Sequence, residues 1–134
     1  MGWTSITNSI SIEPLMLYLS AIFWTLGYDT VYGLQDIHDD EIIGVKSTSI
    51  KFKNNVKVFV GTCYSLCVFL ILTMFVMMDI NKYLLILMVP FIAMFIYQIK
   101  IFKVSNSESS LLAFKNNNLT GLLIFIFIFS FNIL

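Results

Sequence analysis

Five of the eight acidic residues of this 134-residue chain fall within residues 28–52, between long apolar runs. The segment reads YDTVYGLQDIHDDEIIGVKSTSIKF, and its acids are Asp29, Asp36, Asp39, Asp40 and Glu41. Carboxylates at the edge of a membrane-like segment are costly, so they usually have a function there. Hard oxygen ligands suit Mg²⁺ or Ca²⁺ better than zinc. We therefore interpret the segment as a divalent-metal and diphosphate site at a membrane surface.

The spacing of these residues supports that interpretation. Asp29, Tyr32, Asp36 and Asp40 lie three, four and four residues apart. If the helix of the preceding apolar run continues through them, they line one face of it. A row of carboxylates repels itself unless a cation lies among them. Mg²⁺ is usually held by one or two carboxylates together with substrate phosphates.

A basic stretch follows directly and could hold those phosphates. Lys46 comes after Gly44 and offers a point charge to a phosphate oxygen, while Ser47 and Thr48 add hydroxyl donors. The alternative is an ordinary solvated loop, since surface loops are usually charged. The position of the first acid in an apolar run, and the helical period of the acids, favour the site.

His38 has two interpretations. It could join the metal site or carry a proton, or it could be a solvated loop imidazole. Its neighbours are hard carboxylates and form no Cys/His zinc pattern. This chemistry favours the solvated imidazole.

The composition places the segment in a membrane protein. Apolar residues make up 58% of the chain and charged residues 12%, with a mean hydropathy of +0.87. A soluble domain carries roughly 25% charged residues. The net charge is zero, so we expect no bulk attraction to nucleic acid. All eight basic residues are lysine, which excludes bidentate arginine clamps within this chain.

Four apolar runs approach the roughly 20 residues that a membrane-spanning helix needs. They are Pro14–Leu34, Val56–Met78, Tyr83–Phe102 and Leu119–Leu134. The predicted fold is therefore all-α, a polytopic membrane helical bundle of about four helices. Pro90 is expected to kink the third. Seven of the eight lysines fall on one side of these spans, which predicts that the acidic loop is cytoplasmic.

Two smaller patterns lie inside the spans. Cys63 and Cys67 are four residues apart, and we favour two small buried apolar residues over a functional thiol pair. Phenylalanines alternate at period two from Phe125 to Phe131, a pattern typical of a strand. In an apolar run after three spans, we interpret them as part of a lipid-facing or packing helix.

At these residues the chain resembles the UbiA family of membrane prenyltransferases, and most closely its 4-hydroxybenzoate polyprenyltransferases of ubiquinone synthesis. The sequences YDTVYGLQDIHDD and IGVKSTSIKF resemble the second aspartate-rich motif of that family. Downstream, FIYQIKIF at Phe95–Phe102 and LAFKNNNLTGLL at Leu112–Leu123 fit the end of these enzymes. The resemblance covers nearly the whole chain.

The resemblance implies a helical bundle around a central cavity, in which Mg²⁺ binds a polyprenyl diphosphate. The prenyl group is then transferred to the aromatic ring of an acceptor, 4-hydroxybenzoate in the enzymes it resembles most. By position, Asp29, Asp36, Asp39 and Asp40 would be metal ligands. Catalytic roles fall to Asp29, Asp36, Asp40 and Lys46, and substrate binding to Tyr32, Lys46 and Ser47. The expected location is a bacterial inner membrane or a mitochondrial inner membrane.

The run Asn116–Asn118 resembles the asparagines before the last helix of these enzymes. It could form a polar contact near the mouth of the site, or it could cap the helix that begins at Leu119. The sequence leaves the two interpretations equal.

Two features of the family are missing from residues 1–134. No NDxxDxxxD motif is present, and no arginine is available to hold an aromatic carboxylate. We therefore expect residues 1–134 to be the C-terminal portion of a UbiA-like domain that works with a separate N-terminal half. The alternative is a catalytically inactive remnant of a split or truncated gene. An ion-conducting bundle ranks last, because the acids cluster at one edge.

Overall fold

The computed structural model describes residues 2–79, 85–86 and 88–130, and over these residues the protein is helical with no strand, as predicted. In chain order the elements are α1 (Gly2–Thr7), α2 (Ile12–Gly33), α3 (Ile37–Ile43), α4 (Thr48–Lys51), the 3₁₀ turn η1 (Lys53–Asn55), α5 (Val56–Met77), α6 (Met88–Ile101), α7 (Ser107–Lys115) and α8 (Asn117–Ser130). The architecture is consistent with a partial membrane helical bundle.

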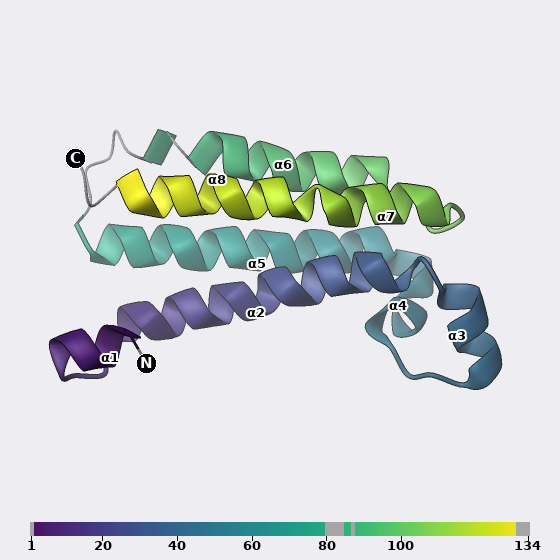
Figure 1. The fold of residues 1–134 in the computed structure, drawn as a ribbon, viewed down its shortest axis with the longest axis horizontal. Coiled ribbons are helices and arrows are strands. Elements are labelled where there is room, and N and C mark those ends of the chain that lie inside the picture. Colours follow the sequence, from purple (N-terminus) through teal and green to yellow (C-terminus); the bar gives the residue numbers. More distant parts are fainter. Residues whose placement is uncertain (1, 80–84, 87, 131–134) are drawn as a thin grey trace.

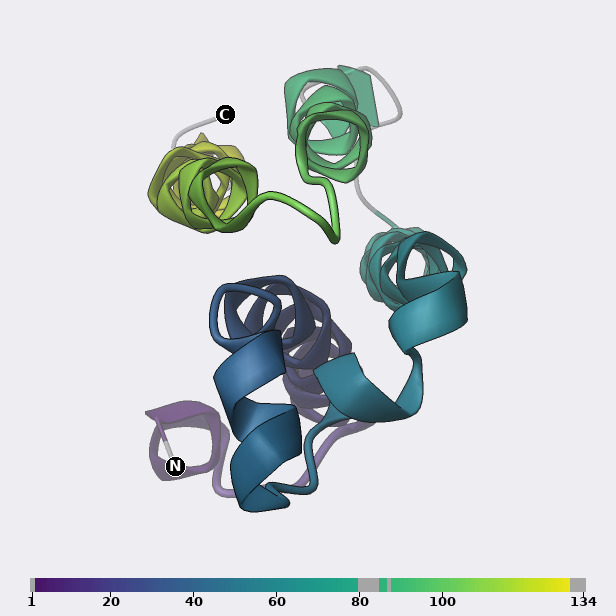
Figure 2. The ribbon, with the colours of Figure 1, turned by 90° about the vertical axis from the view of Figure 1, so that its right-hand side faces the viewer.

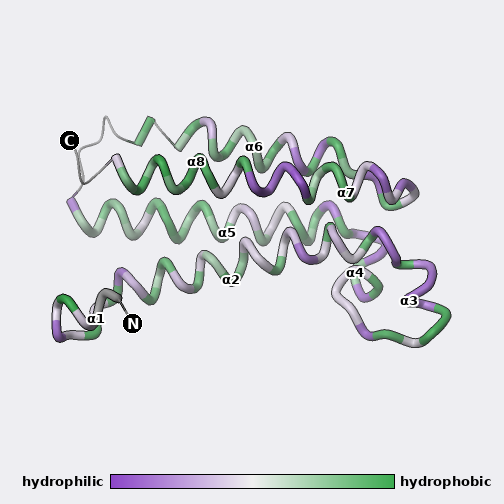
Figure 3. The backbone as a smooth tube through the Cα atoms, in the orientation of Figure 1, coloured by the Kyte–Doolittle hydropathy of each residue, from purple (hydrophilic) through white to green (hydrophobic). Residues whose placement is uncertain are grey.

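Four helical columns, α2, α5, α6 and α7–α8, lie side by side and alternate in direction along the chain (Figure 1). Figure 2 looks along the bundle from the end that carries α3 and α4. The short helices α3 and α4 and the α6–α7 turn lie at this same end, and it is more hydrophilic than the shafts of the columns (Figure 3). The charged segment is thus held beyond one end of an apolar bundle.

The predicted spans coincide in position with these columns, but the first of them, Pro14–Leu34, does not meet the length and composition expected of a membrane-crossing helix. Two helical stretches, Lys53–Met77 and Ser107–Ser130, are long and apolar enough to cross a membrane, and α6 is a shorter apolar helix. Pro90 is the third residue of α6, a position at which a missing N–H costs little. Residue 87 lies outside the described residues, so the predicted kink stays a prediction. Residues 83 and 84 of the third predicted span lie outside the described residues.

The last column begins earlier than Leu119, so the predicted start of the fourth span is wrong. Asn116 has helical dihedral angles, and its carbonyl accepts the N–H of Thr120 at 3.1 Å. The asparagines therefore continue the helical path from α7 into α8 instead of interrupting it. The predicted phenylalanine helix is confirmed as far as Ser130. Phe127 is buried and Phe125 and Phe129 are exposed, while Phe131 lies outside the described residues.

A chain of buried polar side chains joins three of the columns. The Tyr64 hydroxyl donates to Gln98 Oε1 at 2.9 Å, and Gln98 Nε2 donates to Thr120 Oγ1 at 2.7 Å. Gln98 and Thr120 have almost no exposed surface. Because buried polar groups are costly unless they are paired, these bonds fix how α5, α6 and α8 face one another. Cys63 and Cys67 are free and buried, which agrees with a packing role.

Gly27 allows α2 to approach α5 closely. A Cβ at this position would lie 2.5 Å from Tyr64 Cε1. The Tyr64 ring cannot easily move away, because it stacks on Phe95 with centroids 4.1 Å apart and its hydroxyl is bonded to Gln98.

We therefore expect Gly27→Ala to lower the free energy of unfolding by about 1 kcal/mol or more, because overpacking outweighs the helix-propensity gain of alanine. The matched control is Gly121→Ala in α8, where the new Cβ would make an ordinary 3.5 Å contact with Trp24 Cη2. This control should be neutral or slightly stabilising. Denaturant unfolding in mild detergent, followed by circular dichroism, measures both. Equal stabilities of the two variants would contradict the close contact.

Candidate functional site

The acidic segment is divided between two helices. We expected one helix to carry Asp29, Tyr32, Asp36 and Asp40 along a single face, and this expectation is wrong. Helix α2 ends at Gly33, and the next two N–H groups turn back, from Leu34 to the Val31 carbonyl at 3.3 Å and from Gln35 to the Tyr32 carbonyl at 3.0 Å. Helix α3 begins three residues after Leu34.

A hydrogen bond from a distant residue accompanies the break. In a continued helix, the carbonyl of Thr30 would accept the N–H of Leu34. It accepts the hydroxyl of Ser49 instead, at 2.8 Å. The sequence motif could not reveal this contact, because Ser49 lies nineteen residues further along the chain.

Asp29 stands at one end of a cavity on α2. The cavity has a volume of about 410 Å³ and is lined by Tyr18, Ala21, Ile22, Thr25, Leu26 and Asp29. All six residues belong to α2, so the cavity follows one side of this helix. Asp29 is exposed and is the only charged residue of the lining. The arrangement is a mostly apolar tract that ends in a carboxylate.

The other three predicted aspartates flank the start of α3. Asp36 directly precedes the helix and its side chain makes no capping bond, while Asp39 and Asp40 lie in the first turn, where negative charge is favourable. Asp36 and Asp39 are exposed, Asp40 is half-buried, and His38 is exposed. Nowhere in the part of the chain that the structure describes do three or more His, Cys, Asp or Glu side chains gather closely enough to hold a metal ion.

A second cavity lies at the basic loop. Helix α3 ends at Ile43 and is capped by Gly44, which takes the left-handed conformation with φ 77°. The Val45 N–H closes the turn on the Asp40 carbonyl at 3.0 Å. The next residues surround a volume of about 420 Å³. Its lining is Val45, Lys46, Ser47, Thr48, Ile50 and Lys51, and we call it the lysine pocket. Ser47 Oγ also accepts the N–H of Ile50 at 3.3 Å, which makes Ser47 the N-cap of α4.

Two charged groups near the site are already paired. Lys53 Nζ lies 2.7 Å from Glu41 Oε2, and both side chains are partly exposed. Such a pair contributes little stability, about 1 kcal/mol or less. Glu41 therefore already has a cationic partner, whereas the aspartates of the segment form no salt bridge with any described residue.

Tyr32 contacts the last column of the bundle. Its ring packs against Phe114 of α7 with centroids 4.7 Å apart, and the side chain is 44% exposed. It does not belong to the lining of the α2 cavity. The aromatic contact ties the end of α2 to α7, close to the acidic segment.

The asparagine run makes a contact that neither of our two interpretations included. Trp24 Nε1 of α2 donates to Asn117 Oδ1 at 2.7 Å. The sequence shows that Asn117 can form hydrogen bonds beside an apolar run. It does not show that the partner is Trp24, which lies ninety-three residues away.

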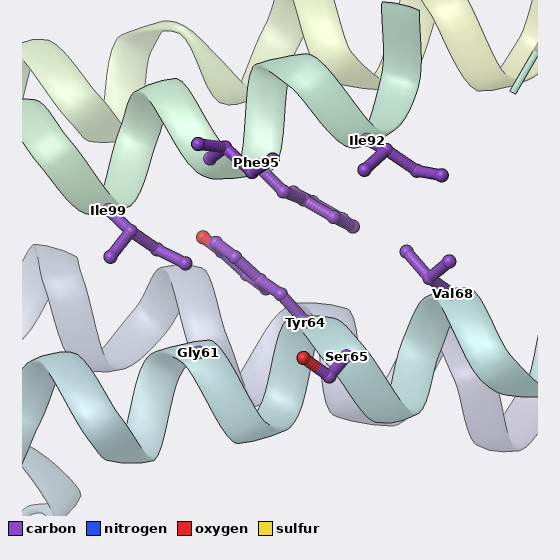
Figure 4. A pocket seen from close by; sticks show the side chains of 8 residues that line it. Gly61, Tyr64, Ser65, Val68, Ile92, Phe95 and Ile99 are labelled. Carbon is purple, nitrogen blue, oxygen red and sulfur yellow. The ribbon is translucent and has the colours of Figure 1, made fainter. Parts of the chain in front are cut away.

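A third cavity, of about 310 Å³, lies between α5 and α6 (Figure 4). In the close view, the Tyr64 and Phe95 rings face each other across the two helices, with Ile92, Ile99 and Val68 around them. No acid or lysine lines this cavity, so it lacks the charged groups of the other two.

The fold and the site define an α-helical bundle of membrane type that carries acids and lysines at one end. Residues 1–131 match the model of the UbiA prenyltransferase family, and the chain belongs to this family. The motif resemblance described above is thereby confirmed.

Three similar curated proteins are named 4-hydroxybenzoate octaprenyltransferase or polyprenyltransferase. A 4-hydroxybenzoate octaprenyltransferase of Providencia stuartii is 33% identical over 129 residues, which cover 96% of this chain and 45% of the relative. One of Yersinia enterocolitica is 34% identical with the same coverage, 96% and 45%. A mitochondrial 4-hydroxybenzoate polyprenyltransferase of Arabidopsis thaliana is 47% identical over 60 residues, covering 44% of this chain and 15% of the relative. The chain thus spans about half the length of the bacterial relatives. No solved structure matches it significantly.

Proposed function

We propose that this chain supplies the second metal- and diphosphate-binding half of a membrane prenyltransferase. The enzyme would transfer a polyprenyl group from its diphosphate to the aromatic ring of 4-hydroxybenzoate. Membership of the UbiA family and the names of the relatives support this proposal. The observation that carries it is the apolar tract on α2 that ends in Asp29.

The shape of that tract suits a lipid diphosphate. Tyr18 and Asp29 are eleven residues apart in one helix, which corresponds to roughly 16 Å of length. A polyprenyl tail would lie along the apolar side chains, and its charged head would lie at the carboxylate end. Since a free diphosphate and a carboxylate repel each other, a cation between them is required.

The acidic side chains suit Mg²⁺ by their chemistry, although no three of them gather among the described residues. Mg²⁺ keeps several waters and takes one or two carboxylates together with substrate phosphates. Asp29 at the tract, or Asp36, Asp39 or Asp40 at α3, would supply those carboxylates. When bound, the ion neutralises charge on the diphosphate and helps it to leave.

The remaining groups hold the leaving diphosphate and keep water away. Lys46 offers a point charge to a phosphate oxygen, and the Ser47 hydroxyl can donate while its oxygen caps α4. Departure of the diphosphate breaks the allylic C–O bond, and an aromatic carbon of the acceptor then forms the new C–C bond and loses its proton. Once a partner covers the open side of the tract, its apolar walls would exclude water, which would otherwise capture the allylic cation.

The side of α2 that carries the cavity would face lipid in a bilayer unless a partner covered it. Asp29 and Thr25 are exposed on it beside apolar residues, and an ionised carboxylate facing lipid is costly. We propose that a separate N-terminal half covers this side and supplies the NDxxD motif and the acceptor-binding groups. The lysines at the α3–α4 end support the proposal that this end lies on the cytoplasmic or matrix side of an inner membrane.

The proposal predicts that individual aspartates, and not bulk charge, hold the metal. Asp36→Asn should weaken Mg²⁺-dependent binding of farnesyl diphosphate about tenfold or more, measured by titration calorimetry on the chain in nanodiscs, because one metal ligand is lost. Glu41→Gln is the matched control, since it removes the same charge from an acid already paired with Lys53. It should change the affinity less than twofold. Equal losses in both variants would refute the assignment.

Activity itself is predicted to require two parts. The chain is co-expressed with the N-terminal half of the Yersinia enterocolitica relative, in a strain that lacks the enzyme, and prenylated 4-hydroxybenzoate is measured. Product should form only with both parts present, and Asp36→Ala should reduce it at least a hundredfold. Absence of product, or an Asp36→Ala variant that behaves like the parent, would favour the inactive-remnant alternative.

A further inference from the structure

Two hydroxyl groups of α4 bond to one residue of α2. Thr48 and Ser49 both reach Thr30, which directly follows Asp29 in the chain. Thr30 is fully buried and Ser49 is 1% exposed. We propose that Thr30 is a positioning residue, which sets the lysine pocket against the acidic end of α2 so that both can bind one diphosphate. This inference rests on the proposed function.

The direction of the first hydrogen bond follows from what Thr30 already donates. Its hydroxyl donates to the Leu26 carbonyl at 2.7 Å, within α2. Since a hydroxyl has one proton, the 2.8 Å contact between Thr30 Oγ1 and Thr48 Oγ1 must be donated by Thr48. The Thr30 side chain is therefore an oriented acceptor, held by its own helix and aimed at α4.

The second hydrogen bond uses the backbone of the same residue. The Thr30 carbonyl is one of the last carbonyls of α2, which have no partner within the helix unless another group supplies one. The N–H of Leu34 bonds to Val31 instead, and the hydroxyl of Ser49 takes the Thr30 carbonyl at 2.8 Å. Losing this bond would leave a buried carbonyl unpaired, which is costly.

A glycine makes room for the contact. A Cβ on Gly33 would overlap Ser49 Oγ, so any larger residue would push α4 away from α2. Gly33 has an ordinary helical conformation, and the requirement at this position is therefore space and not backbone freedom.

Neutral hydrogen bonds suit this role better than ion pairs would. Among the residues that the structure describes, the only salt bridge joins Glu41 to Lys53. Lys46 and Lys51 line the pocket without an acidic partner, and Lys51 Nζ lies 5.7 Å from the centre of the Phe52 ring. If lysines and aspartates held the two segments together directly, they would neutralise each other. The hydroxyl contacts hold the segments in place and leave both charge types available to a ligand.

The test compares Thr30→Val with Thr30→Ser in the full chain in nanodiscs. Valine keeps the shape of threonine and removes the acceptor, whereas serine keeps the hydroxyl. Hydrogen exchange of the amides of residues 45–52 and the Kd of inorganic pyrophosphate with Mg²⁺ are measured. In Thr30→Val we expect the amides of residues 45–52 to exchange at least tenfold faster and pyrophosphate to bind about tenfold more weakly. Thr30→Ser should stay within twofold of the parent in both the exchange rate and the Kd.

Thr48→Val provides a second variant on the partly exposed side of the contact, where the folding of the four columns is not at risk. It should reproduce both effects while the unfolding midpoint of the bundle stays unchanged. Unchanged exchange in both valine variants overturns the inference, and so does faster exchange with unchanged pyrophosphate affinity. A parent chain that binds no pyrophosphate overturns the proposed function itself, and this result is distinct because it appears before any substitution is made.

Discussion

The arrangement of this protein depends on hydrogen bonds between polar side chains that lie inside the apolar bundle. Tyr64, Gln98 and Thr120 form one hydrogen-bonded chain across α5, α6 and α8, and Trp24 with Asn117 forms a second link, between α2 and α8. Dispersion and apolar contacts alone would allow the columns to slide or rotate past one another, because most of their side chains are similar in kind. The buried hydrogen bonds have directions, so they select one arrangement of the columns.

Much of the charge lies at one end of the bundle. The acidic residues from Asp36 to Glu41, with Lys46 and Lys51, lie on α3, α4 and their connections, at the hydrophilic end of the columns (Figure 3). Asp29 is set back along α2, and it stands at the end of the apolar tract. A ligand with a charged head and an apolar tail can therefore meet both environments along one helix, which is what the transfer of a prenyl group requires.

The sequence predicted the all-α class, the order of the apolar columns and the location of the charged segment, since these depend on local composition and period. It failed where distant residues decide the local structure. The helix expected through Asp29 and Asp36 ends at Gly33, where Ser49 bonds to the Thr30 carbonyl, and the asparagines continue a helix that we expected to begin after them. Thr30 looked unremarkable beside its acidic neighbour, because its role comes from a segment nearly twenty residues away. The ligand set of the metal, drawn from Asp29, Asp36, Asp39 and Asp40, stays a prediction.

The surroundings of Trp24 give the molecule a built-in optical reporter. Its indole packs edge-on against Tyr28, Phe91 and Phe95, and its N–H is bonded to Asn117. The ring thus touches three columns at once, and fluorescence emission depends on the polarity and hydrogen bonding around the indole. The chain holds a second tryptophan, Trp3, so in a Trp3→Phe variant the emission of Trp24 would register whether the last column is docked, without any added label.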